Sequence, residues 1–145
     1  PLDVPRVVYS VHMYQPHSFT HQGVYGSPTN LSYPGPIAGK HWDKAAIRRA
    51  FQVARDFQLD RGVHIYIGEF SAIRWAPGDS ACNYLRDVID VMEEYGWDWA
   101  YHAFREWQGW SVEHGGDRKD TRPAATPTDR QKLLQSWFKQ NRRPN

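Results

Sequence analysis

One segment organises the whole chain: Val63-His64-Ile65-Tyr66-Ile67-Gly68-Glu69-Phe70-Ser71. Its apolar and aromatic residues have little polar interruption, which is typical of a strand buried on both faces of a parallel sheet. Gly68 has no Cβ and leaves room for a group that approaches the backbone beside Glu69. The carboxyl ends of parallel strands border the crevice where such sheets place their chemistry. Glu69 is therefore a candidate catalytic carboxylate, although a surface glutamate that ends a strand fits the spacing equally well.

A second apolar run covers about residues 6–14 and contains His12 and Tyr14 near its end. These side chains are two positions apart, so on a strand they point to the same face. A third strand is expected over 97–104. Amphipathic helices are expected at 43–58, 80–95 and 127–140, with Asp43 and Thr126 as the N-caps of the first and last. Strands that alternate with helices predict an α/β fold with parallel strands and outer helices.

The long connection over 15–42 is rich in proline and glycine and also contains histidine, tyrosine and tryptophan. Loops of this length inside a compact domain are usually functional, so we expect it to form a wall of a binding cleft. His17, His21 and His41 have no spacing typical of zinc sites. We therefore expect solvated loop histidines and no metal site.

Composition excludes several classes of function. The 145 residues suffice for one core, and the net charge of +2 comes from interspersed charges, so no nucleic-acid partner is expected. The single cysteine, Cys82, excludes an internal disulfide, and no apolar run approaches the length that spans a membrane. Seven tryptophans and eight tyrosines suit sugar recognition, because pyranose faces stack on flat rings, although about half of these rings are expected simply to fill a core.

His12 and Tyr14 at one strand end, Gly68-Glu69-Phe70 at the next, and the aromatic run 97–107 together resemble family 5 glycoside hydrolases. That family contains cellulases and related β-glycanases built on a (β/α)8 barrel. The resemblance covers nearly the whole chain and matches the carboxyl-terminal part of the family's domain. Because a whole barrel needs about 250 residues, residues 1–145 are expected to be a partial TIM barrel of three βα units, resembling units six to eight.

The resemblance implies a retaining endo-β-1,4-glucanase that acts on β-glucan polysaccharide or oligosaccharide, with Glu69 as the catalytic nucleophile. Tyr14 would hydrogen-bond to this carboxylate, and His12 would line the same subsite. A buried histidine that donates to a backbone carbonyl is the alternative for His12. Hydrolysis by two carboxyl groups needs no cofactor, so none is expected.

The family also places a tryptophan at the end of its last strand, as a platform under the sugar. In this chain the strand reads Tyr101-His102-Ala103-Phe104, and the first tryptophan after it is Trp107. Either Trp107 takes the role from the loop or His102 occupies the position. Further candidates for substrate binding are Trp42, Trp75 and Trp110, each about as consistent with a structural role, and Arg74.

The second carboxyl group of the mechanism is missing from the expected place. In the family the general acid follows an asparagine in an Asn-Glu pair, and this chain contains no such pair. Glu106 and Glu113 are the only loop carboxylates placed to substitute. Charged loop residues that bind Arg105 or solvent are the stronger interpretation of both.

Three parallel strands leave open edges, so a partner is expected to complete the sheet. It is either the amino-terminal part of the same barrel as a separate chain, or another copy of this chain through self-association. The chain begins at Pro1 without a signal peptide, so a processed or excised product is expected. The resemblance implies a secreted or periplasmic location. A non-catalytic glucan-binding half-barrel is the alternative function.

Overall fold

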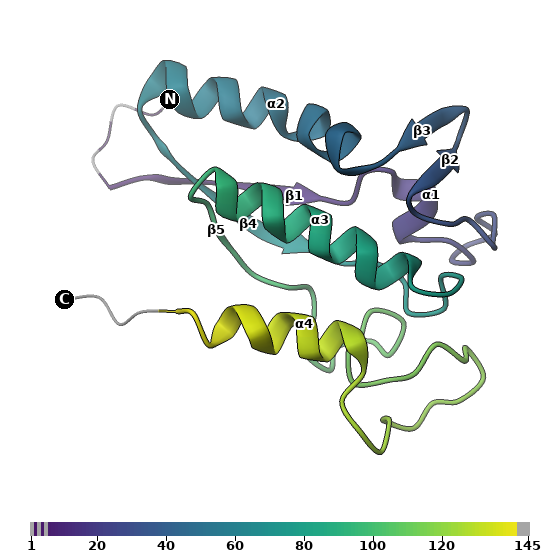
Figure 1. Ribbon diagram of the computed structural model, residues 1–145. Helices are drawn as coiled ribbons and strands as arrows, with labels where there is room; N and C mark the ends of the chain where they lie inside the picture. Colours follow the sequence, from purple (N-terminus) through teal and green to yellow (C-terminus); the bar gives the residue numbers. More distant parts are fainter. Residues whose placement is uncertain (1, 3, 5, 142–145) are drawn as a thin grey trace.

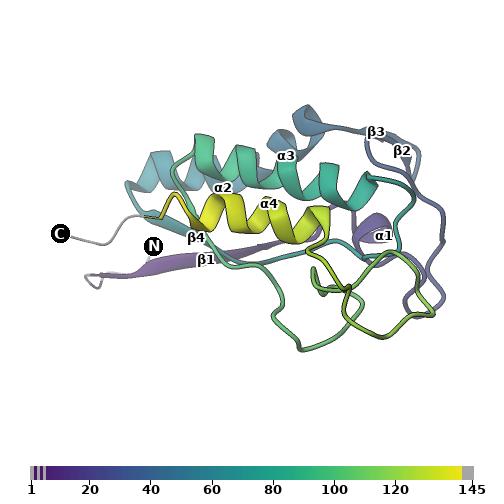
Figure 2. The same cartoon turned by 60° about the horizontal axis from the view of Figure 1, so that its bottom comes forward.

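The computed structural model describes residues 2, 4 and 6–141. Its main sheet has three parallel strands in the order β1 (Val8–Met13), β4 (His64–Phe70) and β5 (Asp98–Trp99). Each strand is followed by a longer helix, namely α2 (Lys44–Arg61), α3 (Ser80–Glu94) and α4 (Asp129–Phe138). The helices run side by side in Figure 1, and Figure 2 shows them on one side of the sheet. The predicted α/β class with parallel strands and outer helices is confirmed.

The hydrophobic core lies between the sheet and the helices. On β4, Ile65 and Ile67 are buried, whereas His64 and Tyr66 are more exposed. This period of two is typical of a strand with one covered face. The expected burial of β4 on both faces is therefore wrong, because the described helices lie on one side of the sheet only. The helical side of the core comes mainly from α3, through Tyr84, Leu85, Val88, Ile89 and Met92.

Capping fixes the ends of the helices. The Asp43 carboxylate accepts a hydrogen bond from the Ala46 amide at 2.8 Å, as expected, and α2 ends at Gly62, whose φ of +60° is left-handed. For α4 the expected cap at Thr126 is wrong. The hydroxyl of Thr128 accepts from the Gln131 amide and also donates to a carbonyl of the preceding loop, which fixes the helix start two residues later.

The connections after the strands gather at the carboxyl end of the sheet. The segment 15–42 is more ordered than expected, since it contains the short helix α1 (His17–Thr20) and an antiparallel hairpin of β2 (Gly35–Ile37) and β3 (Lys40–Trp42). β5 is shorter than the expected strand over 97–104. It nevertheless stays beside β4, because the amides of Ala100 and His102 still donate to carbonyls of β4 at 2.9 and 3.1 Å. None of the described helices combines the length and the apolar character needed to cross a membrane.

Candidate active site

Glu69 lies at the carboxyl end of β4 and accepts a hydrogen bond from Tyr14 at 2.9 Å, between the Tyr14 hydroxyl and Oε2. The Nδ1 atom of His12 lies 3.5 Å from the same oxygen. The register of β1 against β4 shifts between Val11 and His12, so His12 pairs with Glu69 and not with Gly68. Such irregularities re-aim side chains. The shift thus brings together His12, Tyr14 and Glu69, the three residues predicted from the sequence to share a site.

The electrostatics of this pair favour a protonated tyrosine next to a carboxylate. Burial, and then the hydrogen bond to Glu69, raise the pKa of the Tyr14 hydroxyl far above its ordinary value of 10.0. The hydroxyl therefore stays protonated at all physiological pH values and donates a hydrogen bond to Oε2 of Glu69. The Glu69 side chain remains 35% exposed, so an approaching molecule can reach the carboxylate.

The space beside Gly68 is filled by neighbouring side chains of β1. A Cβ at this position would lie 2.5 Å from Oγ of Ser10 and 3.4 Å from Nε2 of His12. The glycine therefore permits β1 and β4 side chains to approach closely beside Glu69. The sequence suggested that the missing Cβ leaves open space for a ligand. In the structure this space is instead occupied by side chains of β1.

His102 follows β5 and lies on the opposite side of Glu69 from His12, which is on β1. Its Nδ1 atom is 4.0 Å from Oε2 of Glu69, and its Nε2 atom is 3.3 Å from Oε2 of Glu106. Trp107 is farther along the same loop and packs edge-on against Trp75 and Trp110, with ring centroids 5.8 and 5.1 Å apart. Of the two alternatives for the position next to the carboxylate, the geometry therefore favours His102.

The two loop carboxylates differ in their surroundings. Arg105 binds Glu113 through two nitrogens, at 2.9 and 3.1 Å, and this hydrogen-bonded ion pair lowers the pKa of the Glu113 carboxyl group. A general acid of a glycosidase needs a raised pKa instead. Glu106 meets the imidazole of His102, and 65% of its side chain is exposed. Such acids usually sit in apolar surroundings, so neither residue has the expected environment.

The other three candidate tryptophans, Trp42, Trp75 and Trp110, differ in whether they contact the site. Trp110 packs against Tyr14 at a centroid distance of 5.9 Å and edge-on against His102 at 5.3 Å, which places it beside the carboxylate. Trp75 is tied back to the protein, because its indole nitrogen donates to the Gln22 carbonyl at 2.9 Å. Trp42 is partly buried on β3 against the core. Only Trp110 among these three lies against the Tyr14–Glu69 pair.

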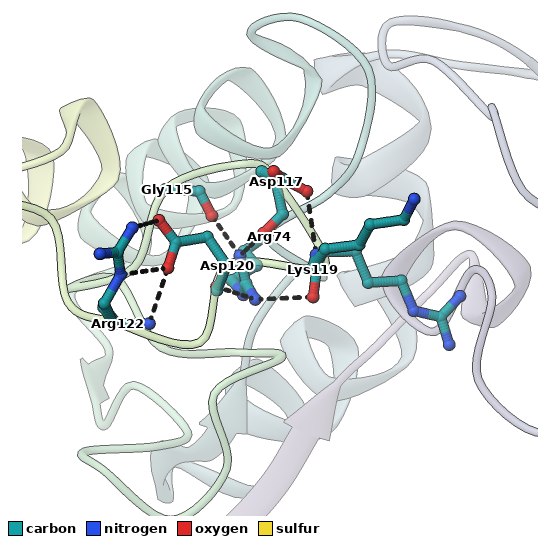
Figure 3. A network of polar contacts seen from close by, with 7 residues as sticks. Arg74, Gly115, Asp117, Lys119, Asp120 and Arg122 are labelled. Atoms are coloured by element: carbon teal, nitrogen blue, oxygen red, sulfur yellow. Dashed lines mark hydrogen bonds and ion pairs between the residues drawn. The ribbon is translucent and has the colours of Figure 1, made fainter.

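Arg74 has a different role from the one expected. Its side chain is only 2% exposed, and its guanidinium group donates to four backbone carbonyls at 2.5 to 3.3 Å (Figure 3). The accepting residues are Gly115, Asp117, Arg118 and Asp120. The predicted contact of Arg74 with substrate is therefore wrong, because its donors hold the loop after β5. The sequence gives no signal for this, since the acceptors lie more than forty residues downstream.

A cleft of about 530 Å³ opens next to Trp110. We call it the His–Trp cleft, and it is lined by His17, His21, Val24, Tyr25, Ser27, Trp107 and Trp110. The two histidines, expected to be solvated, are stacked with ring centroids 3.9 Å apart and an angle of 13° between the planes. The two histidines are four positions apart, and residues with this spacing are neighbours on the surface of a helix. The spacing is the signal in the sequence from which the stack could have been predicted. Within residues 2, 4 and 6–141, His, Cys, Asp and Glu side chains form no group of three or more that could hold a metal ion.

Known proteins resemble this chain in sequence and in structure. The family model Cellulase (glycosyl hydrolase family 5) matches residues 1–108. Endoglucanase C of Acetivibrio thermocellus is 27% identical over 119 residues, which cover 65% of this chain and 35% of the relative.

Two solved structures have a similar fold. A hyperthermophilic endo-β-1,4-glucanase in complex with substrate gives a TM-score of 0.68 at 27% identity, over 86% of this chain and 39% of that one. Cel5A of Thermotoga maritima in complex with cellobiose gives 0.63 at 26% identity, over 92% and 42%. This chain thus spans less than half the length of each of the proteins compared.

Proposed function

The chain belongs to the cellulase family, glycosyl hydrolase family 5, and from this premise we propose that it carries the nucleophile side of a retaining endo-β-1,4-glucanase site. The proposal rests on one observation above all. Glu69 ends a parallel strand, is accessible, and receives a hydrogen bond from a tyrosine whose pKa is raised. A carboxylate held in this way is oriented for attack and keeps one oxygen free for the reaction.

In the proposed reaction a Glu69 oxygen attacks the anomeric carbon of the sugar, and the bond to the leaving oxygen breaks as a general acid protonates that oxygen. The resulting glycosyl ester is hydrolysed when water attacks the same carbon and gives its proton to the now deprotonated acid, and the Glu69 carboxylate is released. Tyr14 orients Oε2, while the imidazoles of His12 and His102 border this oxygen and are available to bind sugar hydroxyls. The nucleophile role of Glu69 needs no cofactor.

We assign the general acid to a part of a (β/α)8 barrel outside this chain. Glu113 is paired with Arg105 and has a lowered pKa, and Glu106 is largely exposed, so neither fits the role. The missing carboxylate would come from the amino-terminal part of the barrel or from another copy of this chain. The uncovered face of the sheet, with exposed Val8, Ser10 and His12, supports such a completion.

For the substrate we propose a β-1,4-glucan or its oligosaccharides. The support is the family itself, together with a structurally similar Cel5A whose structure holds cellobiose. Cellulases of this family are commonly extracellular, and a secreted or periplasmic location is the corresponding proposal for this chain.

A non-catalytic glucan-binding role is the second candidate. It is favoured by one specific observation, namely that Glu113 and Glu106 both lack the environment of a general acid. In that case the aromatic residues around Glu69 would hold sugar without cleaving it.

Release of reducing ends from a soluble β-1,4-glucan separates the two candidates. The wild-type chain is assayed alone and mixed with the amino-terminal part of a related barrel, beside Glu69→Gln and the control Glu113→Gln. We expect hydrolysis in the mixture, its loss in Glu69→Gln, and its retention in Glu113→Gln. Glucan binding by both wild type and Glu69→Gln, without turnover in any mixture, would favour the binding role.

A further inference from the structure

Another pocket, of about 390 Å³, lies where α3 and α4 begin and shares no lining residue with the His–Trp cleft. The two helices run side by side and start at the same end of the molecule (Figure 1). We call it the arginine pocket, because Arg74 and Arg130 line it together with the first residues of both helices. Its volume is many times the ~30 Å³ that one water molecule occupies in the liquid, so a small hydrated ion fits inside.

Both guanidinium groups of the pocket are buried, and within the described residues they hydrogen-bond to backbone carbonyls only. Arg74 uses its four terminal hydrogens for four carbonyls of the loop after β5 (Figure 3). Its remaining donor, Nε–H, is buried and has no hydrogen-bond partner in the described part of the chain. Arg130 donates to the carbonyls of Ser111 and His114, which use two of its five donors. The wall of the pocket therefore contains positively charged groups with donors that lack acceptors.

The charges of these two arginines are not neutralised at close range. Among the residues that the structure describes, neither Arg74 nor Arg130 forms an ion pair, and Asp120, whose charge acts on Arg74, is itself bound by Arg122. Burial lowers the pKa of both guanidinium groups, and the charge of Arg74 adds to the lowering at Arg130. The two buried cations thus act on each other, and a buried charge without a partner is costly. An anion in the pocket would remove this cost.

The start of α3 adds two unpaired backbone donors to the same pocket. Asp79 is the N-cap residue, but its side chain accepts no hydrogen bond from the helix. The amides of Ala81 and Cys82 consequently find no acceptor among the described residues, and both residues are buried and line the pocket. Free amides at a helix start, together with the helix dipole, favour a bound anion. The start of α4 differs, because the hydroxyl of Thr128 caps it.

The other ionisable groups of the pocket do not supply the missing negative charge. Burial raises the pKa of the Cys82 thiol, which therefore stays neutral at neutral pH. Asp129 is exposed and pairs with Lys132 at 3.2 Å, and Asp79 is exposed as well. Solvent and salt screen exposed charges much more than buried ones, so the two buried arginines determine the charge of the pocket interior.

We propose that the arginine pocket binds a small tetrahedral oxyanion, inorganic phosphate or sulfate. The anion lies between the uncapped start of α3 and the two buried guanidinium groups. It accepts hydrogen bonds from the free amides and from Arg130, and it neutralises Arg74. It thereby links α3 to α4 and to the loop after β5, so its binding stabilises the folded chain. The proposal depends neither on the assignment of Glu69 nor on glucan hydrolysis.

Isothermal titration calorimetry of the 145-residue chain with millimolar sodium phosphate tests the proposal, with sodium chloride adjusted so that the ionic strength stays constant. We expect saturable binding of one phosphate per chain. The thermal midpoint should rise by about 5–10 °C once phosphate reaches about 100 times its dissociation constant, because a ligand that binds only the folded chain stabilises it by mass action. Sulfate has the same tetrahedral shape and should bind as well.

Two positions of the pocket allow its charge to be changed. Cys82→Asp places a fixed carboxylate on the wall beside the free amides, so it should replace the anion and abolish phosphate binding. Cys82→Asn is the matched control, because it has the shape of aspartate without the charge, and it should retain phosphate binding. Asp79→Asn removes a negative charge from the exposed rim and should tighten phosphate binding by up to about fivefold, the factor for two charges about 4 Å apart in water.

Three results would overturn the proposal. The first is the absence of saturable phosphate binding to the wild-type chain. The second is an equal rise of the thermal midpoint in wild type and Cys82→Asp, which would be the general stabilisation that phosphate and sulfate give to folded proteins. The third is weaker phosphate binding in Asp79→Asn. Loss of glucan hydrolysis in Glu69→Gln concerns the proposed function alone, because Glu69 does not line this pocket.

Discussion

At the scale of single residues, the environment of Glu69 depends on small backbone features of two strands. The register shift after Val11 aligns His12 with Glu69, and Gly68 allows the side chains of β1 to approach. Tyr14 then supplies one hydrogen bond to Oε2 and keeps its proton because its pKa is raised. One oxygen is thereby anchored, and the side chain is still 35% exposed, so that a substrate can reach it, which is what a nucleophile requires.

Tyr14→Phe should slow the formation of the glycosyl ester without unfolding the protein. The loss of one hydrogen bond to a charged group, worth about 1.5–3 kcal/mol, predicts a fall in rate of about 10- to 100-fold. Phenylalanine retains the ring contacts with His21 and Trp110, so the thermal midpoint should change little. Dinitrophenyl β-cellobioside is a suitable substrate, because its leaving group needs no general acid. A rate equal to that of wild type would show that the hydrogen bond does not contribute.

At the scale of elements, the loop after β5 is held by two buried arginines from its neighbours. Arg74 donates to four carbonyls of this loop, and Arg130 of α4 donates to the carbonyls of Ser111 and His114. A long irregular segment has few internal partners for its carbonyls, and charged donors satisfy them strongly. Arg118 also links the loop to the segment after β1, through the carbonyl of Gly23. These contacts make the loop a fixed wall of the site.

Arg74→Met should reduce the free energy of unfolding by at least about 3 kcal/mol, because four carbonyls lose a charged donor in a buried position. Urea unfolding measures this change. Arg122→Ala is the matched control, since Arg122 pairs with Asp120 in the same loop but is exposed, and its unfolding midpoint should equal that of wild type. Equal midpoint shifts in the two variants would contradict the proposed role of Arg74.

Gly109→Ala should weaken cellotriose binding as much as Trp107→Ala does, although it removes no aromatic ring. A Cβ at residue 109 would lie 2.4 Å from two ring atoms of Trp107, so the indole has to leave its place. Gly115→Ala serves as the control in the same loop, because a Cβ there meets no atom of the described chain within 4 Å. Binding that is unaffected by Gly109→Ala would mean that the position of Trp107 is irrelevant to the ligand.

At the scale of the whole molecule, the local patterns predicted the parallel sheet, the helices and the cap at Asp43. They did not predict that β4 is covered on one face only, because this depends on where the helices lie and not on the residues of the strand. The carbonyl contacts of Arg74 join loops more than forty residues apart, which no local pattern reports.

The residues of the candidate site were predictable for a reason other than local sequence patterns. The resemblance to a family brought together Glu69, Tyr14 and His12, whereas spacing alone left Glu69 open to two interpretations. The His17–His21 stack was missed because α1 is too short to give a periodic pattern. What the sequence could supply was the identity of the candidate residues, and what it could not supply was their contacts across the sheet.

Covalent labelling of Glu69 is the most direct test of the central claim. The chain is incubated with dinitrophenyl 2-deoxy-2-fluoro-β-cellobioside, which reacts with a nucleophile without a general acid and then releases the sugar slowly. We predict that the intact mass increases by one fluorocellobiosyl group, that the label lies on the peptide containing Glu69, and that Glu106→Gln is labelled as wild type is. Absence of label in the wild type, or labelling that persists in Glu69→Gln, would contradict the assignment of Glu69 as the nucleophile.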